Sequence, residues 1–241
     1  MGQTDPVGRG LISDVLGEAF DVYRRLWGRS VLVGGLIFAV VSLGDAFTAN
    51  SRSAWPELVA LLLTLVGSVL VQGALVLVVA DLHDGREPAT ISEYYDRTRD
   101  KLGTLLGASI LYGFGAIVIA PIALWSLAIP LVMIEGLSRR EAFRRSSLLT
   151  RDRIWRILLL VLISAGIGGL IRLAIAGAFD SVHGFVAVWA VGTIANAIAA
   201  PYSAHVLTVL YYRLTAPERP VLPDRPPRDA WQSIWDKEKR S

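Results

Sequence analysis

The chain has 241 residues, of which 53% are hydrophobic and only 19% charged, with a mean hydropathy of +0.50 and a net charge of +3. The charges are gathered between long apolar runs, which is typical of an integral membrane protein and excludes an ordinary soluble domain. The absence of cysteine excludes disulfides and thiolate metal sites. The net positive charge does not indicate a nucleic-acid partner, because the cations lie beside the apolar runs. Twenty-one of the 24 cations are arginine, a bias typical of a bacterial protein from a GC-rich genome.

The N-terminal 28 residues carry several charges and no apolar core. No cleavable signal peptide is therefore predicted, and the first apolar segment is expected to remain as a span. A helix needs about 20 apolar residues to cross a membrane. Four runs reach or approach this length, namely 30–48, 57–81, 154–177 and 184–212.

The stretch 102–134 is nearly uncharged but too long for one ordinary span, since as a single helix it would measure about 50 Å. Pro121 and Pro130 interrupt it, and an internal proline breaks or kinks a helix. The stretch is predicted to form either one long kinked span or two helices, a full one at 102–120 and a shorter one near 121–135.

The positions of lysine and arginine decide between these alternatives. Twenty-two of the 24 cations lie in segments 1–29, 82–101, 135–156 and the tail from Arg213, which the positive-inside rule places in the cytosol. Two of these segments flank 102–134, so the chain must cross an even number of times between them, as two spans or as a re-entrant hairpin. We therefore predict an all-α, six-span bundle at 13–215, after a polar segment 1–12, in a bacterial cytoplasmic membrane with both termini cytosolic.

An internal repeat is predicted from the segments that precede the first, third and fifth spans. Residues 18–20, 93–95 and 141–143 each consist of glutamate followed by alanine or tyrosine and then an aromatic residue, and each leads into a basic stretch and a span. Thr90–Glu93 and Ser138–Glu141 have the spacing of capping boxes, which begin helices. The pattern predicts three repeats of an interfacial amphipathic helix followed by a transmembrane hairpin.

Such a helix can lie in the lipid headgroup layer with its apolar face down and its arginines on anionic phosphates. The helix expected at 138–150 is the most cationic of the three, which makes membrane lipids the predicted partner. Its candidate contacts are Arg139, Arg140, Arg144 and Arg145. The alternative is that these arginines only enforce the topology.

Polar residues deep inside spans are functional candidates, because burying them in lipid is costly. Gln72, Asn196 and His205 meet this criterion, and each is either an interhelical hydrogen-bonding residue or part of a ligand or transport site.

Gly107-Ala108-Ser109 and His205 invite comparison with intramembrane serine proteases, but Ile110 stands where a glycine should follow the serine, so a membrane-embedded enzyme is only the third alternative. No zinc or phosphate-binding motif occurs, and no catalytic residue, cofactor or metal site is predicted. Gly103-x-x-x-Gly107 and the glycines of 166–169 are expected to let helices pack closely.

The predicted tail is 216–241. Its first part, 216–228, is rich in proline and charge and is expected to be extended and disordered. Trp231, Ile234 and Trp235 then share one face of a short helix, which would dock on the membrane surface or on a protein partner.

Two stretches resemble the membrane domain of bacterial glycerophosphodiester phosphodiesterases. They are 134–150, from Ile134-Glu135-Gly136 to Leu149-Thr150, and the proline-containing last span with its exit Leu210-Tyr211-Tyr212-Arg213-Leu214. The resemblance covers about residues 10–215. In that family a separate soluble barrel domain, with a His-Arg-Gly start and metal-binding carboxylates, performs catalysis, and this chain contains none of it.

The resemblance thus implies a membrane module without the family's catalytic residues. The sequence is interpreted as a non-enzymatic membrane protein, serving as a lipid-interacting accessory or scaffold module. The alternative is a transporter or channel for a small solute or lipid, with its site near the proline-broken segment, because broken helices line binding sites at membrane depth in transporters.

Overall fold

The computed structural model describes residues 10–48, 54–115, 119–179 and 184–216, and every regular element in these ranges is helical. The predicted all-α class is therefore confirmed for this part of the chain. Most of the predicted polar segment 1–12 lies outside the described residues, as does the tail with Trp231 and Trp235. The elements are α1 (Leu11–Arg25), α2 (Trp27–Thr48), α3 (Ala54–His83), α4 (Ile91–Arg99), α5 (Leu102–Gly115), α6 (Ile119–Leu124), α7 (Ala128–Ile134), α8 (Arg139–Thr150), the 3₁₀ turn η1 (Arg151–Arg153), α9 (Ile154–Ala178) and α10 (Phe185–Thr215).

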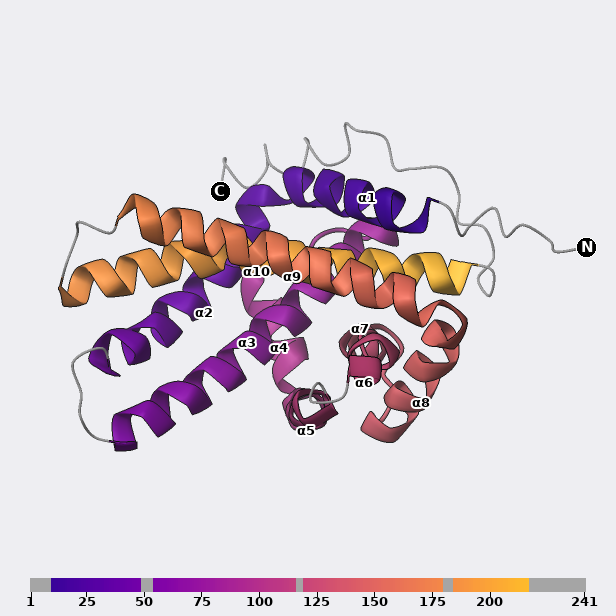
Figure 1. The fold of residues 1–241 in the computed structure, drawn as a ribbon, viewed down its shortest axis with the longest axis horizontal. Helices are drawn as coiled ribbons and strands as arrows, with labels where there is room; N and C mark the ends of the chain where they lie inside the picture. Colours follow the sequence, from indigo (N-terminus) through magenta and orange to yellow (C-terminus); the bar gives the residue numbers. More distant parts are fainter. Residues whose placement is uncertain (1–9, 49–53, 116–118, 180–183, 217–241) are drawn as a thin grey trace, which may run out of the picture.

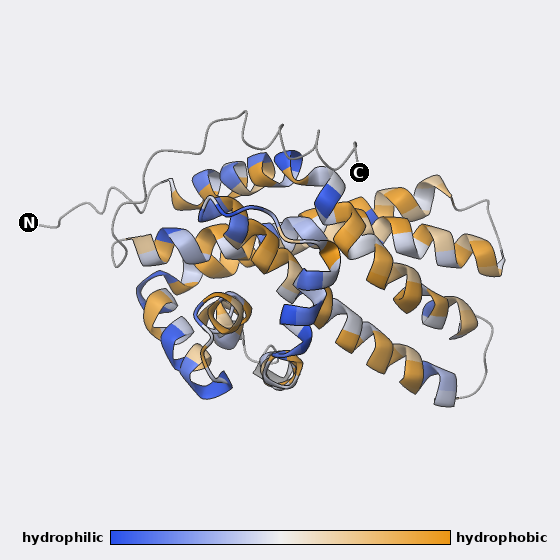
Figure 2. Cartoon of the chain, turned by 180° about the vertical axis from the view of Figure 1, so that it is seen from behind, coloured by the Kyte–Doolittle hydropathy of each residue, from blue (hydrophilic) through white to orange (hydrophobic). Residues whose placement is uncertain are grey.

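Four helices in the described ranges are long and apolar enough to cross a membrane, and they coincide with the four predicted runs: α2, α3, α9 and α10. Large apolar side chains lie on their outer surfaces, where Leu36, Leu62, Leu162 and Leu173 are each more than half exposed. Hydrophobic residues dominate the long helices throughout (Figure 2). Apolar surface of this extent is typical of helices that face lipid.

The hydrophobic core gathers around α10, which contacts α1, α2, α3, α7 and α9. In Figure 1, α9 and α10 run side by side along the long axis, and α2 and α3 form a second hairpin that diverges from them. The contact of α10 with α2 is very close, because a Cβ on Gly34 would lie 3.5 Å from the Cα of Ala197. A Cβ on Gly44 would lie 3.3 Å from the Cα of Ala60, which brings α2 equally close to α3.

Among the glycines singled out in the sequence, Gly168 does face α10, since a Cβ on it would lie 3.8 Å from the backbone oxygen of Ala199, but four others have different surroundings. A Cβ on Gly103, Gly166 or Gly169 would meet nothing within 4 Å, and one on Gly107 would meet the guanidinium of Arg139 instead of a neighbouring helix backbone. The prediction that these glycines let helices pack closely is therefore wrong for these four. GxxxG spacing does not report which face of a helix is turned to a neighbour.

In its described parts, 102–115 and 119–134, the proline-containing stretch forms the short helices α5, α6 and α7. Pro121 and Pro130 each occupy the first turn of their helix, α6 and α7, where a missing N–H breaks no hydrogen bond. The break between the two helices falls at 125–127. With 14 residues, α5 measures about 21 Å, less than the roughly 30 Å of a hydrocarbon core. Figure 1 shows α5 and α7 nearly end-on, whereas α9 and α10 lie in the plane of the picture.

The two ends of this stretch lie next to each other. The ammonium of Lys101, just before α5, donates to the carbonyls of Val132 (3.0 Å) and Met133 (3.2 Å) at the end of α7. Desolvation in this position lowers the pKa of Lys101. The contact satisfies carbonyls that have no hydrogen-bond donor at the end of α7. It also means that the start of α5 and the end of α7 lie side by side.

Short helices precede α2, α5 and α9 in the described ranges, at the places where the sequence predicts amphipathic helices: α1, α4 and α8. The predicted helix starts are confirmed, since the Thr90 hydroxyl accepts from the Glu93 amide (3.3 Å) and Glu141 accepts from the Ser138 amide (3.0 Å). Hydrogen bonding to Ser138 lowers the pKa of the Glu141 carboxyl.

Equivalent positions of the three short helices are buried. The residue after each glutamate is fully buried. The residue one helical turn later is also buried in all three helices. These pairs are Ala19 and Tyr23 in α1, Tyr94 and Thr98 in α4, and Ala142 and Ser146 in α8. The inner faces pack on protein, with α1 against α10 and α9, α4 against α3, and α8 against α6 and α7. Protein therefore covers these inner faces, while Phe20 on α1 (53% exposed) and Leu148 on α8 (63% exposed) remain uncovered, and contact of these helices with lipid stays a prediction.

Candidate functional site

Polar side chains converge where α3, α7 and α10 end. Both α3 and α7 are followed by an acidic residue and a glycine, Asp84-Gly85 and Glu135-Gly136. The two glycines have positive φ angles of 65° and 70°, a left-handed conformation that glycine adopts without steric cost. The turns thus hold two carboxylates at the same place, directly after the ends of α3 and α7.

The last turns of α10 reach both carboxylates. Tyr211 donates its hydroxyl to Oε1 of Glu135 (2.9 Å), and Tyr212 donates to Oδ1 of Asp84 (3.4 Å). The ring of Tyr212 also stacks on His83, with centroids 3.6 Å apart. Two adjacent tyrosines therefore connect α10 to the ends of both earlier hairpins.

Arg213 and Arg145 extend this cluster to α1 and α8. Arg213 pairs with Glu18 (2.7 Å) and approaches Asp14 (3.5 Å), both on α1. Arg145 pairs with Oε2 of Glu135 at 2.8 Å. One of the four predicted lipid contacts, Arg145, thus makes an ion pair within the protein, and its contact with lipid stays a prediction.

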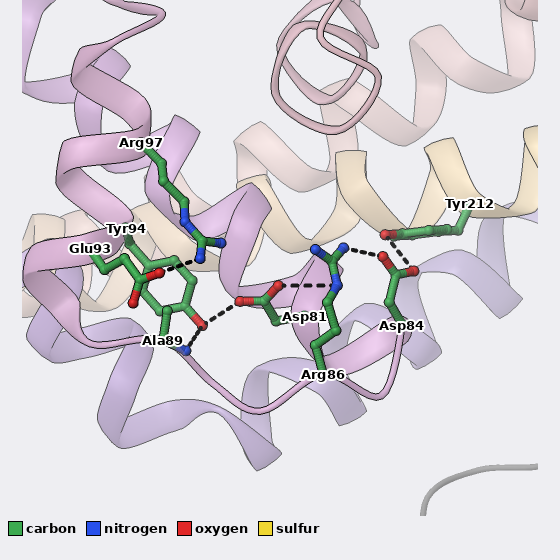
Figure 3. A network of polar contacts seen from close by, with 8 residues as sticks. All are labelled: Asp81, Asp84, Arg86, Ala89, Glu93, Tyr94, Arg97 and Tyr212. Atoms are coloured by element: carbon green, nitrogen blue, oxygen red, sulfur yellow. Dashed lines mark hydrogen bonds and ion pairs between the residues drawn. The ribbon is translucent and has the colours of Figure 1, made fainter.

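The buried carboxylate of Asp81 lies in the last helical turn of α3, just before the Asp84-Gly85 turn (Figure 3). Asp81 is only 3% exposed; it accepts from the hydroxyl of Tyr94 (2.9 Å) and lies 3.6 Å from Nε of Arg86. The same hydroxyl accepts from the backbone amide of Ala89 at 3.1 Å. Burial raises the pKa of Tyr94, and the negative charge of Asp81 raises it further. The hydrogen bond to Asp84 raises the pKa of Arg86.

The three polar residues predicted as intramembrane candidates do not converge. Nε2 of the fully buried His205 lies 3.3 Å from the Ser30 hydroxyl, and its Nδ1 has no partner among the described residues. Asn196 donates to Gly192 of its own helix (3.0 Å), and Gln72 is half-buried on α3. Neither the cavity at 151–156 nor the apolar groove of about 650 Å³ between α2 and α3 includes any of the three.

Tyr23 has a structural role beside His205. The Tyr23 hydroxyl donates to the carbonyl of Ile198 on α10 at 2.8 Å, which joins α1 to α10. Burial raises the pKa of Tyr23 to about 12. The polar groups here thus complete contacts between helices, as one of the two alternatives for His205 predicts.

The remaining predicted arginines lie on the outer side of α8. Arg140 and Arg144 are exposed, and Arg139 is exposed but packs its side chain over Gly107. Directly after α8 the chain turns sharply into α9, and six consecutive residues line an open cavity of about 580 Å³ at this turn. This basic elbow consists of Arg151, Asp152, Arg153, Ile154, Trp155 and Arg156.

Two cations of the elbow, Arg151 and Arg156, differ from the cations around α4, which pair with acidic residues. Around α4, Arg86, Arg97 and Arg99 pair with Asp81 or Asp84, Glu93 and Asp96. Within the described ranges, Arg151 and Arg156 are exposed and have no ion pair. Beside them Trp155 is 79% exposed. The elbow therefore presents cations and an aromatic ring to an external anion.

The sequence predicts a span-exit turn at 81–86 but does not connect Asp81, the two acidic–glycine turns or the elbow with a site. The doubled pattern of an acidic residue, a glycine and a capping box was a signal that could have identified the turns. Among the described residues no group of three or more His, Cys, Asp or Glu side chains is placed to hold a metal ion. Comparison of the chain with protein-family models, with curated proteins and with solved structures gives no match.

Proposed function

We propose that the protein is a non-enzymatic integral membrane protein that binds anionic phospholipid at the basic elbow. The observation that carries the proposal is the open cavity at the start of α9, where Arg151 and Arg156 lie exposed beside Trp155. Guanidinium groups hold phosphate by paired, charge-assisted hydrogen bonds, and tryptophan prefers the membrane interface. A headgroup phosphate of a cytosolic-leaflet lipid has the charge and position to meet these residues.

The proposed topology is a bacterial cytoplasmic membrane protein with both termini in the cytosol. In it, each of the three units consists of a short cytosolic helix and a hairpin, and the second hairpin, 102–134, enters the membrane and returns without crossing. The shortness of α5 and the contact of Lys101 with Val132 support this arrangement. The relation to the membrane domain of glycerophosphodiester phosphodiesterases stays a prediction; Tyr211 and Glu135, from its two motifs, are in contact.

Cysteine labelling tests the topology, because the chain has no natural cysteine. We expect Gly113→Cys on α5 to resist a membrane-impermeant maleimide added outside intact cells, while Thr48→Cys at the far end of α2 reacts. Ser92→Cys on α4 should react only after permeabilisation. Labelling of Gly113→Cys from outside would establish six crossings instead of a re-entrant hairpin.

Lipid binding is tested with the double variant R151Q/R156Q. Each basic residue near an anionic surface contributes about 1 kcal/mol, so the variant should bind phosphatidylglycerol roughly thirtyfold more weakly than the wild type. The measurement is titration of the full-length protein, in neutral detergent, with phosphatidylglycerol and with phosphatidylcholine.

The matched control is R24Q/R25Q, which removes the same charge from two exposed arginines at the end of α1. It should keep the affinity for phosphatidylglycerol within about threefold of the wild type, a change of less than 1 kcal/mol. Equal losses in both double variants would mean that overall charge, rather than the elbow, attracts the lipid. Equal binding of the two lipids by the wild type would contradict the proposal itself.

A further inference from the structure

One face of α9 is turned away from the rest of the protein. The outer face consists of residues at alternating spacings of four and three, so that all lie on one side of the helix: Trp155, Leu159, Leu162, Gly166, Gly169 and Leu173. Leu159, Leu162 and Leu173 are 48%, 54% and 69% exposed, and a Cβ on Gly166 or Gly169 would meet nothing within 4 Å. The opposite face carries the buried residues of α9 and packs on α10, α6 and α1.

This outer face begins at the basic elbow. Trp155 belongs to both, since it lines the elbow cavity and is the first residue of the face. Arg151 and Arg156, which have no ion pair in the described ranges, therefore lie at one end of the apolar outer face, called the strip below. A phospholipid has the same order of chemistry, an anionic phosphate followed by a hydrocarbon chain, so the charge and the continuity of the surface fit one lipid molecule.

The length of the strip agrees with one acyl chain. One leaflet provides about half of the roughly 30 Å hydrocarbon core, or about 15 Å. At 1.5 Å per residue, about ten residues of helix cover this depth, so a chain that starts beside Trp155 ends near Gly166. The missing side chains at Gly166 and Gly169 leave a shallow notch at this depth, bordered by Leu162 and Leu173.

We propose that a single anionic diacyl phospholipid binds lengthwise along α9. Its phosphate is held by Arg151 and Arg156, and one acyl chain lies on the outer face and ends over Gly166. This inference rests on the proposed headgroup function of the elbow and adds the chain as the second half of the ligand. The site therefore selects a membrane lipid rather than a soluble phosphate compound.

The test compares two lipids that share a headgroup, dioleoyl and dihexanoyl phosphatidylglycerol, on the full-length protein in neutral detergent. Native mass spectrometry counts both bound lipid and protein copies. Gly166→Leu fills the notch, and its new side chain starts in open space, so the fold is kept. We expect about a fourfold weaker affinity for the dioleoyl lipid, the scale of one methylene contact, and an unchanged affinity for the dihexanoyl lipid.

Gly177→Leu is the matched control, because Gly177 is also open but lies far beyond one leaflet on the same helix, and it should bind both lipids as the wild type does. Leu162→Ala provides a second variant that removes chain contact without adding bulk, and it should also weaken only the dioleoyl lipid. R151Q/R156Q should weaken both lipids.

The outcomes separate the two proposals. If R151Q/R156Q weakens both lipids but neither Gly166→Leu nor Leu162→Ala changes the dioleoyl affinity, the chain path is wrong and the headgroup site stands. If R151Q/R156Q changes neither lipid, the headgroup site fails and the chain path with it. If Gly166→Leu instead reduces the number of protein copies and leaves lipid binding unchanged, a second copy of the chain occupies the face, which also overturns the inference.

Discussion

Tyr94→Phe is expected to lower the free energy of unfolding by about 2–3 kcal/mol, the scale of a hydrogen bond to a buried charge. The hydroxyl of Tyr94 is the donor 2.9 Å from the carboxylate of Asp81, and it also accepts from the Ala89 amide. Phenylalanine keeps the packing of this fully buried ring and leaves both partners without the bond. Denaturant unfolding in detergent micelles, followed by tryptophan fluorescence, measures the loss.

Tyr112→Phe is the control, because the hydroxyl of Tyr112 donates to an uncharged carbonyl, that of Ile122, at 3.2 Å. Its cost should be only about 0.5–1.5 kcal/mol. Equal costs for the two variants would show that the Asp81 carboxylate does not depend on Tyr94.

The pH dependence of the Tyr94→Phe effect follows from the raised pKa of Tyr94. A tyrosine with a raised pKa in the folded state contributes its full stability below the unfolded value near 10, and the contribution falls as the pH rises above it. The difference in stability between the wild type and Tyr94→Phe should therefore be constant at neutral pH and shrink above about pH 10.

Ser146→Ala is expected to lower the free energy of unfolding by about 2–3 kcal/mol, because it leaves the buried Leu127 amide without a partner and removes the shorter of two hydrogen bonds to the Leu124 carbonyl. Ser146 is fully buried on α8, and its hydroxyl accepts from the Leu127 amide (3.3 Å) and donates to the Leu124 carbonyl (2.6 Å). These groups flank the break between α6 and α7, where no helical hydrogen bond can satisfy them. Thr150 also donates to Leu124, at 3.3 Å, so the carbonyl keeps part of its bonding.

The adjacent Ser147→Ala supplies the control. Ser147 is half-buried and donates only to Phe143 of its own helix, so its replacement by a good helix former should change the unfolding free energy by less than about 0.5 kcal/mol. Unfolding of both variants under the same denaturant conditions gives the comparison. Similar values for the two serines would refute a specific role of Ser146 at the break.

The local features of the fold could be predicted from the sequence. Apolar length predicted α2, α3, α9 and α10, and the capping residues Thr90 and Ser138 marked the first residues of α4 and α8 within one position. Pro121 and Pro130 indicated that 102–134 is interrupted. Each of these features depends on residues that are close together in the sequence, so it can be predicted without knowledge of the tertiary structure.

Features that depend on distant contacts were not predictable from the sequence alone. Periodicity shows that α1, α4 and α8 have apolar faces, but the same face can meet lipid or protein, and here it meets protein. The surroundings of Gly107 and the salt bridge of Arg145 are set by tertiary placement for the same reason. Asp81 lies at a span end, where a carboxylate is normally solvated, and only the fold shows that Tyr94 covers it.

The contacts of Tyr211, Tyr212 and Arg213 have a consequence for the order in which the protein matures. A ribosome releases these residues after all the other contacting partners, Glu18, Asp84 and Glu135, have been made. Until then each of these carboxylates lacks its partner on α10. Helices α1 to α9 can therefore form before α10 is complete, but the contacts that join α10 to α1 and to the ends of α3 and α7 form only when the last described helix has left the ribosome.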